Sequence, residues 1–156
     1  MSAEVAHLQT VAAWLRLGRR VDAVSRLLLL ATLLAGIAWL CWPKAGSSAC
    51  TRVGLAIAWL AGLVQCVYAA RVQFDADLFA QAAMQARESD ADSARDDLDA
   101  ALLQLGLLPM AKAGRDWPER VAGARRLLRR QCQWHLAQWL AFVVALIGAA
   151  TATLGR

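Results

Sequence analysis

Residues 53–70 read VGLAIAWLAGLVQCVYAA, an apolar stretch that contains no Asp, Glu, Lys, Arg or His. Two further stretches share this character, LLLLATLLAGIAWLCW at residues 27–42 and LAQWLAFVVALIGAATATL at residues 136–154. A membrane-spanning helix needs roughly 17–25 apolar residues, and it must satisfy its backbone hydrogen bonds internally. The three stretches therefore predict three transmembrane helices.

The composition of the whole chain agrees with a helical membrane protein. Hydrophobic residues make up 59% of the 156 residues, above the roughly 45–50% of globular proteins. Leu and Ala dominate, which favours helix over strand. The net charge of +5 is dispersed along the chain instead of forming a phosphate-binding patch, which argues against a nucleic-acid partner. The predicted class is an all-α integral membrane protein.

The distribution of basic residues predicts the orientation. Lys and Arg are concentrated before the first stretch and between the second and third, and such segments stay in the cytoplasm. This predicts a bacterial inner (cytoplasmic) membrane protein with a cytoplasmic N-terminus and a periplasmic C-terminus. The predicted order is an N-terminal amphipathic helix at 1–22, transmembrane helix 1 at 23–43, a periplasmic loop at 44–52, transmembrane helix 2 at 53–70, a cytoplasmic helical region at 71–134 and transmembrane helix 3 at 135–154.

The N-terminal segment has the pattern of a short amphipathic helix. Val5, Leu8, Ala12 and Leu15 recur at helical spacing, and Gly18 can end the helix. Such a helix fits the membrane interface and fits equally well against the cytoplasmic region. The sequence leaves both interpretations open.

The second and third spans are predicted to extend into the cytoplasm as a helical hairpin. The extension of the second span has Phe74, Leu78 and Ala82 on one predicted apolar stripe. Acidic side chains dominate residues 75–99 and basic ones residues 112–130. Surface ion pairs are weak, so we expect these charges to set the register of the hairpin and buried apolar groups to stabilise it.

Local signals predict where the helices between the spans end and begin. A helix at residues 93–105 is followed by Gly106 at its C′ position and then by Pro109. Asp116 and Glu119 form a capping pair for the next helix, with Pro118 in its first turn. Residues 117–154 are predicted to be one helix, or two nearly coaxial ones.

The spans themselves carry a helix-packing pattern. Small residues recur every four positions on spans two and three, and such stripes let helices approach closely in lipid. The stripes fit packing within the chain and fit docking to a partner equally well. The two glutamines within these spans are predicted to hydrogen-bond each other or a common partner. The predicted packing residues are Gly54, Ala58, Gly62, Ala141, Ala145, Ala149, Gln65 and Gln138.

The runs of charged residues give one candidate site, for lipid headgroups. The basic run before span three predicts a contact with anionic phospholipid headgroups, although the topology signal alone accounts for it. The acidic run lacks the Gly of a calcium loop and is interpreted as a helix start. The basic run comprises Arg125, Arg126, Arg129 and Arg130, and the acidic run Asp90, Asp92, Asp96, Asp97 and Asp99.

No catalytic, metal or cofactor site is predicted. His7 and His135 have no Cys, Ser or carboxylate at a spacing that suggests catalysis or ligation. Cys41 and Cys50 flank the loop after the first span. The sequence is compatible with a disulfide between them and with two free thiols.

These observations favour a non-catalytic accessory or scaffold subunit of a bacterial inner-membrane complex. Its expected partners are a larger membrane protein or complex and anionic phospholipid. A homo-oligomeric channel or transporter component is the alternative. A membrane-bound enzyme acting on a lipid-linked substrate ranks last, because the acidic and basic runs would have to converge in one pocket.

Overall fold

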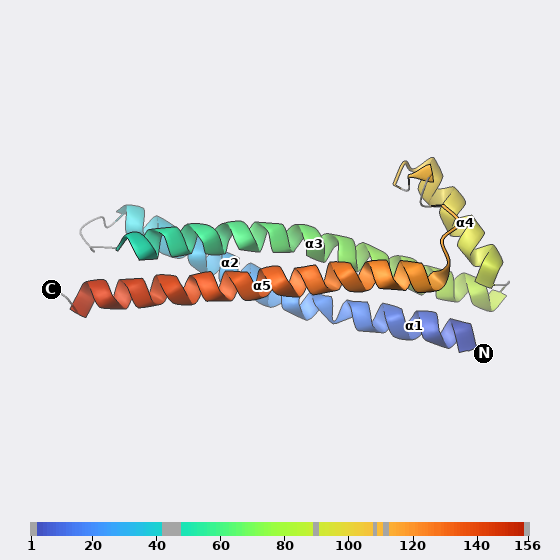
Figure 1. Ribbon diagram of the computed structural model, residues 1–156, viewed down its shortest axis with the longest axis horizontal. Coiled ribbons are helices and arrows are strands. Elements are labelled where there is room, and N and C mark those ends of the chain that lie inside the picture. The colour runs from blue at the N-terminus through green and yellow to red at the C-terminus, as the bar shows by residue number, and fades with distance from the viewer. Residues whose placement is uncertain (1–2, 42–47, 89–90, 108, 111–112, 155–156) are drawn as a thin grey trace. The chain divides into compact units, whose positions relative to one another are not determined.

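The computed structural model describes residues 3–41, 48–88, 91–107, 109–110 and 113–154, and these residues contain no β-strand (Figure 1). The prediction of an all-α chain is confirmed for this part of the protein. Of the predicted loop at 44–52, residues 44–47 lie outside the described residues, and residues 49–52 are the first turn of α3 instead of loop. The helices are α1 (Ala3–Arg16), α2 (Gly18–Cys41), α3 (Ala49–Glu88), α4 (Ala91–Gln104) and α5 (Trp117–Leu154).

Three helical segments are long and apolar enough to cross a membrane, as predicted. They lie within Ala3–Cys41, Ala49–Glu88 and Trp117–Leu154. The prediction of one helix over residues 117–154 is confirmed by α5. Gly18 was predicted to follow the end of the N-terminal helix. In the structure α1 ends at Arg16, one turn residue follows, and Gly18 is the first residue of α2.

The chain divides into two compact units. The first unit comprises residues 1–18 and 71–128, and the second comprises residues 19–70 and 129–156. Helices α3 and α5 contribute to both, since the unit boundaries fall inside them.

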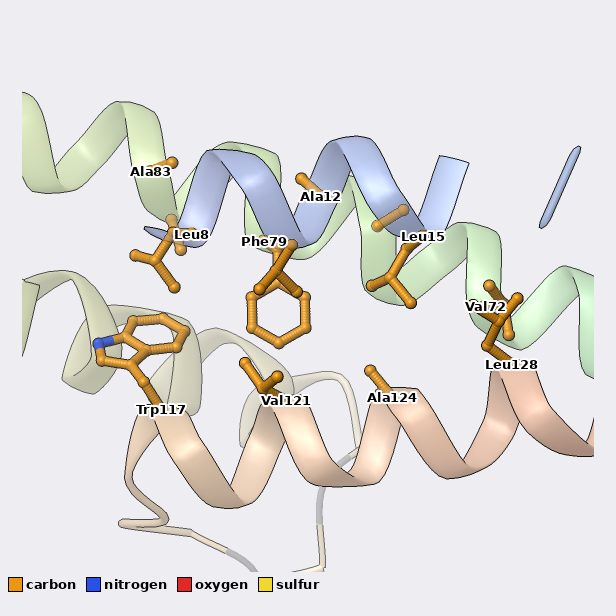
Figure 2. Packing of buried hydrophobic residues seen from close by; sticks show 13 residues of the cluster. Leu8, Ala12, Leu15, Val72, Phe79, Ala83, Trp117, Val121, Ala124 and Leu128 are labelled. Carbon is orange, nitrogen blue, oxygen red and sulfur yellow. The ribbon is translucent and has the colours of Figure 1, made fainter. Parts of the chain in front are cut away.

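The core of the first unit is built from α1, α3 and α5. Leu8 and Leu15 of α1 are fully buried, and they share one core with Phe79 of α3 and with Val121 and Leu128 of α5 (Figure 2). A buried Leu or Val side chain stabilises by roughly 1.5–3 kcal/mol relative to an exposed one. In this structure α1 packs against α3 and α5.

The apolar stripe of α3 in this unit differs from the predicted one. Phe74 is 46% exposed, whereas Val72 and Phe79 are buried in the cluster. The buried face also carries Ala76 and Ala83, whose small side chains let α1 and α5 approach α3 closely. The predicted stripe is wrong at Phe74 and right at Ala82, which is buried in the cluster.

The predicted C-terminal cap of α4 and N-terminal cap of α5 are confirmed, although α4 comprises Ala91–Gln104 instead of residues 93–105. Gly106 has a φ of 67°, and its N–H donates to the Leu103 carbonyl at 3.0 Å, while Leu107 N–H donates to the Leu102 carbonyl at 2.9 Å. This pair of bonds is a Schellman motif. Glu119 N–H donates to Asp116 Oδ1 at 2.9 Å, so Asp116 caps α5.

Candidate functional site

Small residues bring α3 and α5 into close contact in the second unit. A Cβ placed on Gly54 would lie 2.9 Å from the Ala141 carbonyl oxygen and 2.9 Å from the Ala145 nitrogen. Ala58 is fully buried, and Ala145 is 2% exposed. The two stripes thus face each other within this chain, with backbone against backbone.

Two further glycines in this unit lie where another part of the chain comes close to their helix. A Cβ on Gly62 would lie 2.4 Å from Leu29 Cδ1 and 2.5 Å from Gln138 Nε2. Gly148 is covered by the N-terminal turn of α3, where Ser48 Oγ donates to the Gly148 carbonyl at 3.1 Å. Gly62 therefore makes room for both α2 and the Gln138 amide.

The Gln138 amide is paired with α2 rather than with Gln65. The Ser25 hydroxyl donates to Gln138 Oε1, and Gln138 Nε2 donates to the Ser25 carbonyl at 3.1 Å. Both side chains are fully buried. This reciprocal pair ties α5 to the start of α2.

Gln65 corrects the prediction that the two span glutamines are hydrogen-bonded to each other or to a common partner. Its side chain is fully buried, and neither Oε1 nor Nε2 has a hydrogen-bond partner among the described residues. The reason is that Gln138, which lies against Gly62, is already engaged with Ser25. A buried amide without partners is a cost to the fold.

This difference predicts opposite effects for the two glutamines. We expect Gln65→Met to raise the stability of the protein by about 1 kcal/mol, because it replaces an unsatisfied amide by an apolar group of similar length. Gln138→Met should lower it by about 1 kcal/mol, since it removes an interhelical pair. Thermal unfolding in detergent micelles, followed by circular dichroism, measures both changes. Equal effects of the two substitutions would contradict the conclusion that Gln138 is hydrogen-bonded and Gln65 is not.

Helix α2 has a buried polar face that was not predicted from the sequence. Asp22, Ser25 and Thr32 are all at most 4% exposed. Arg26 Nη2 lies 2.6 Å from Asp22 Oδ2, and Thr32 donates to the Leu29 carbonyl at 2.8 Å. The spacing of Asp22, Ser25 and Thr32 along one helical face was the available signal.

The basic run of α5 is exposed. Arg125, Arg126, Arg129 and Arg130 all lie on the surface of the described protein. Arg125 is also in contact with α1, because its guanidinium lies 5.8 Å from the centre of the Trp14 ring. The predicted contact of this run with anionic headgroups stays a prediction.

The acidic run does not gather around a common centre in the described residues. Asp96 and Asp97 are exposed, while Asp99 is 6% exposed and forms an ion pair with Arg120. Asp99 Oδ2 also accepts the Gly114 N–H at 2.8 Å. Asp90 and the side chain of Asp92 lie outside the described residues. Within the described part of the chain, no group of three His, Cys, Asp or Glu side chains could hold a metal ion.

The Asp99–Arg120 pair joins α4 to the start of α5. Arg120 Nε also donates to the Arg115 carbonyl at 3.1 Å, and its guanidinium lies 5.9 Å from the Trp117 ring centre. The arginine is thus held by a carboxylate, a carbonyl and an aromatic face. The pair joins one carboxylate of the acidic segment 75–99 to one base of the basic segment 112–130.

The remaining nucleophilic and imidazole groups are dispersed. Cys41 and Cys50 are both exposed free thiols. His7 is exposed, and His135 Nε2 accepts the indole N–H of Trp139 at 3.1 Å.

Asp75 lies on α3 in the first unit, five residues beyond the apolar stretch of span two. Burial raises the pKa of the Asp75 carboxyl from 3.8 to about 6. Its neighbours on the buried face are Val72, Ala76 and Phe79, so the ionised form loses hydration. The fold is therefore less favourable for a charged Asp75 than for a protonated one.

This shift predicts a pH-dependent stability. Below about pH 4 the carboxyl is protonated in both states, and as pH rises from about 4 to 6 only the unfolded chain ionises, so folding stability falls. We expect Asp75→Asn to stabilise the protein at neutral pH, and this gain should fade between about pH 6 and pH 4. Chemical unfolding across this range measures it. The exposed Asp97→Asn is the control, and a pH-independent gain in Asp75→Asn would contradict the prediction.

The helices indicate a membrane protein by their length and composition, with two compact helical units. No family model, curated protein sequence or solved structure matches the chain.

Proposed function

We propose that the protein is a small non-catalytic accessory or scaffold subunit of a bacterial inner-membrane complex. In this proposal α2, α3 and α5 anchor it in the bilayer, with the N-terminus in the cytoplasm and the C-terminus in the periplasm. The first unit then forms the cytoplasmic surface, in which the extensions of α3 and α5 make a helical hairpin. Its partner is a larger membrane protein or complex, and anionic phospholipid contacts Arg125, Arg126, Arg129 and Arg130.

The observation that carries this proposal is an apolar tip after α4. Leu105, Leu107 and Met110 are 71%, 58% and 80% exposed. Three large apolar side chains within six residues are costly to leave in water, and such surfaces mark protein contacts. Met is common at binding surfaces because its side chain adapts to its partner. We define this apolar tip as Leu105, Leu107 and Met110.

The small-residue stripes no longer argue for a partner, because Gly54 and Gly62 are covered within the chain. The polar groups needed to line a pore in an oligomer are also buried inside the chain. Gln65, Gln138 and Thr32 are at most 3% exposed. Both points favour an accessory subunit that binds through its first unit over a homo-oligomeric channel.

The proposal is tested by co-purification. The protein is tagged at its C-terminus, extracted from native membranes in a mild detergent, and sized, and its companions are identified by mass spectrometry. We expect a larger partner in stoichiometric amount. Combining Leu105→Ser, Leu107→Ser and Met110→Ser should remove that partner while the helical content stays unchanged.

A matched control is available in the same unit. Met84 of α3 is 56% exposed, and Met84→Ser should leave the complex intact. A monomer or a symmetric oligomer without a partner would reject the accessory role. A partner that survives the triple substitution would place its binding surface elsewhere.

A further inference from the structure

The second unit has an apolar groove on its surface, between the C-terminal half of α2 and the N-terminal turns of α3. Its volume is about 350 Å³, and its walls include Ile37, Leu40, Leu55 and Trp59. Gly36 lies in this groove, and a Cβ on it would have no atom within 4 Å. The groove thus has open space where a larger residue would fill it.

The interior of the groove offers little to a polar ligand. Its two threonines are already satisfied, since Thr32 donates to the Leu29 carbonyl at 2.8 Å and Thr51 Oγ1 lies 3.0 Å from Ser48 Oγ. Apart from Arg52, the other described residues that line the groove are Gly, Ala, Leu, Ile and Trp, and their polar side-chain atoms are the two indole N–H groups of Trp39 and Trp59. An occupant must therefore be a hydrocarbon chain over most of its length.

One charge lies at the groove. Arg52 is the sole charged side chain among the described residues that line it, and it is exposed. Its guanidinium lies 5.8 Å from the centre of the Trp39 ring, which is another lining residue. Arg52 is in the first turn of α3, at the end of the apolar stretch, where a span meets the headgroups.

The second unit cannot neutralise Arg52 with an acidic side chain of its own. Asp22 is the sole Asp or Glu in residues 19–70 and 129–156, and it forms an ion pair with Arg26. A cation at the headgroup level, above an apolar groove, is complementary to an anionic amphiphile.

We propose that this groove binds one anionic phospholipid, with its phosphate on Arg52 and an acyl chain along the groove beside Gly36. The site is distinct from the basic run of α5, since it lies where α2 ends and α3 begins. It is independent of the accessory role, because it uses neither the apolar tip nor a protein partner.

Photo-labelling tests the site directly. The full-length protein is reconstituted in phosphatidylcholine vesicles that carry a small fraction of phosphatidylglycerol with a diazirine in its acyl chain. A parallel sample carries diazirine-tailed phosphatidylcholine. After irradiation, the labelled residues are mapped by peptide mass spectrometry. We expect labelling by phosphatidylglycerol to concentrate on the groove, above the level on exposed α5 residues such as Leu140 and Leu146.

Two substitutions separate the headgroup contact from the chain contact. Arg52→Gln should lower phosphatidylglycerol labelling of the groove by about fivefold, the effect of one basic side chain near anionic headgroups, and leave phosphatidylcholine labelling unchanged. Gly36→Leu should lower labelling by both lipids, because the added side chain occupies the groove.

Matched controls are Arg20→Gln, which removes an exposed charge at the other end of α2, and Gly123→Leu, at another glycine with open space. Both should leave groove labelling unchanged. Uniform labelling around the spans, or Arg52→Gln without effect on the phosphatidylglycerol preference, would overturn the proposal. A groove that neither lipid labels would also overturn it and would indicate that a protein segment fills it.

Discussion

Gly54→Ala should destabilise the protein by about 1–3 kcal/mol, although alanine is the better helix former. The added methyl group would lie 2.9 Å from both the Ala141 carbonyl oxygen and the Ala145 nitrogen. These are backbone atoms of α5, and they cannot rotate away as a side chain can. Helices α3 and α5 must therefore separate, and the packing of Ala58 and Ala145 around this contact is weakened.

Gly36→Ala is the matched control for this substitution. It adds the same methyl group to a glycine in α2 that has no atom within 4 Å of a Cβ. We expect it to stabilise the protein by about 0.5–1 kcal/mol, because only the helix propensity changes. Thermal unfolding in detergent measures both variants. A stabilising Gly54→Ala would show that α3 and α5 do not approach as closely as described.

Asp99→Ala should cost about 3 kcal/mol, since it leaves Arg120 without its carboxylate in a site where little water reaches it. The side chains of Asp99 and Arg120 are 9% and 13% exposed. The substitution also removes the acceptor of the Gly114 N–H. We expect α4 to detach from the start of α5, with faster amide hydrogen exchange in residues 99–107 and 113–120.

Asp96→Ala provides the comparison on the same helix. Asp96 forms an ion pair with Arg95 at 3.3 Å, but its side chain is 72% exposed, so its loss should cost less than about 1 kcal/mol. The double variant Asp99→Ala with Arg120→Ala should lose less than the sum of its two single variants. Additive losses in this cycle would mean that the two side chains do not interact.

The features predicted correctly from the sequence are those decided by neighbouring residues. The apolar runs predict long helices because their composition alone sets that state. Gly106 and Asp116 predict helix ends because capping bonds join residues at most five positions apart. None of these features requires knowledge of which helix lies beside which.

The features that escaped prediction depend on the register between helices. Gln138 hydrogen-bonds to Ser25, which lies 113 residues away in the sequence. The rotation of α5 about its axis decides that the Gln138 amide faces Ser25 and not Gln65. The burial of Phe79 in place of Phe74 has the same origin. The small-residue stripes indicate that helices approach closely, but the sequence does not state which helix each stripe contacts.

The composition of the first unit's core has a consequence for biosynthesis. Its contacts join Leu8 and Leu15 near the start of the chain to Val121 and Leu128 of α5. A chain made from its N-terminus completes α1 before α3 and long before α5, so the apolar face of α1 has no protein partner at first and an incomplete core until α5 is made. The bilayer surface is the nearest apolar environment for such a face. We therefore expect α1 to rest on the membrane in the nascent chain and to transfer into the core when α5 arrives.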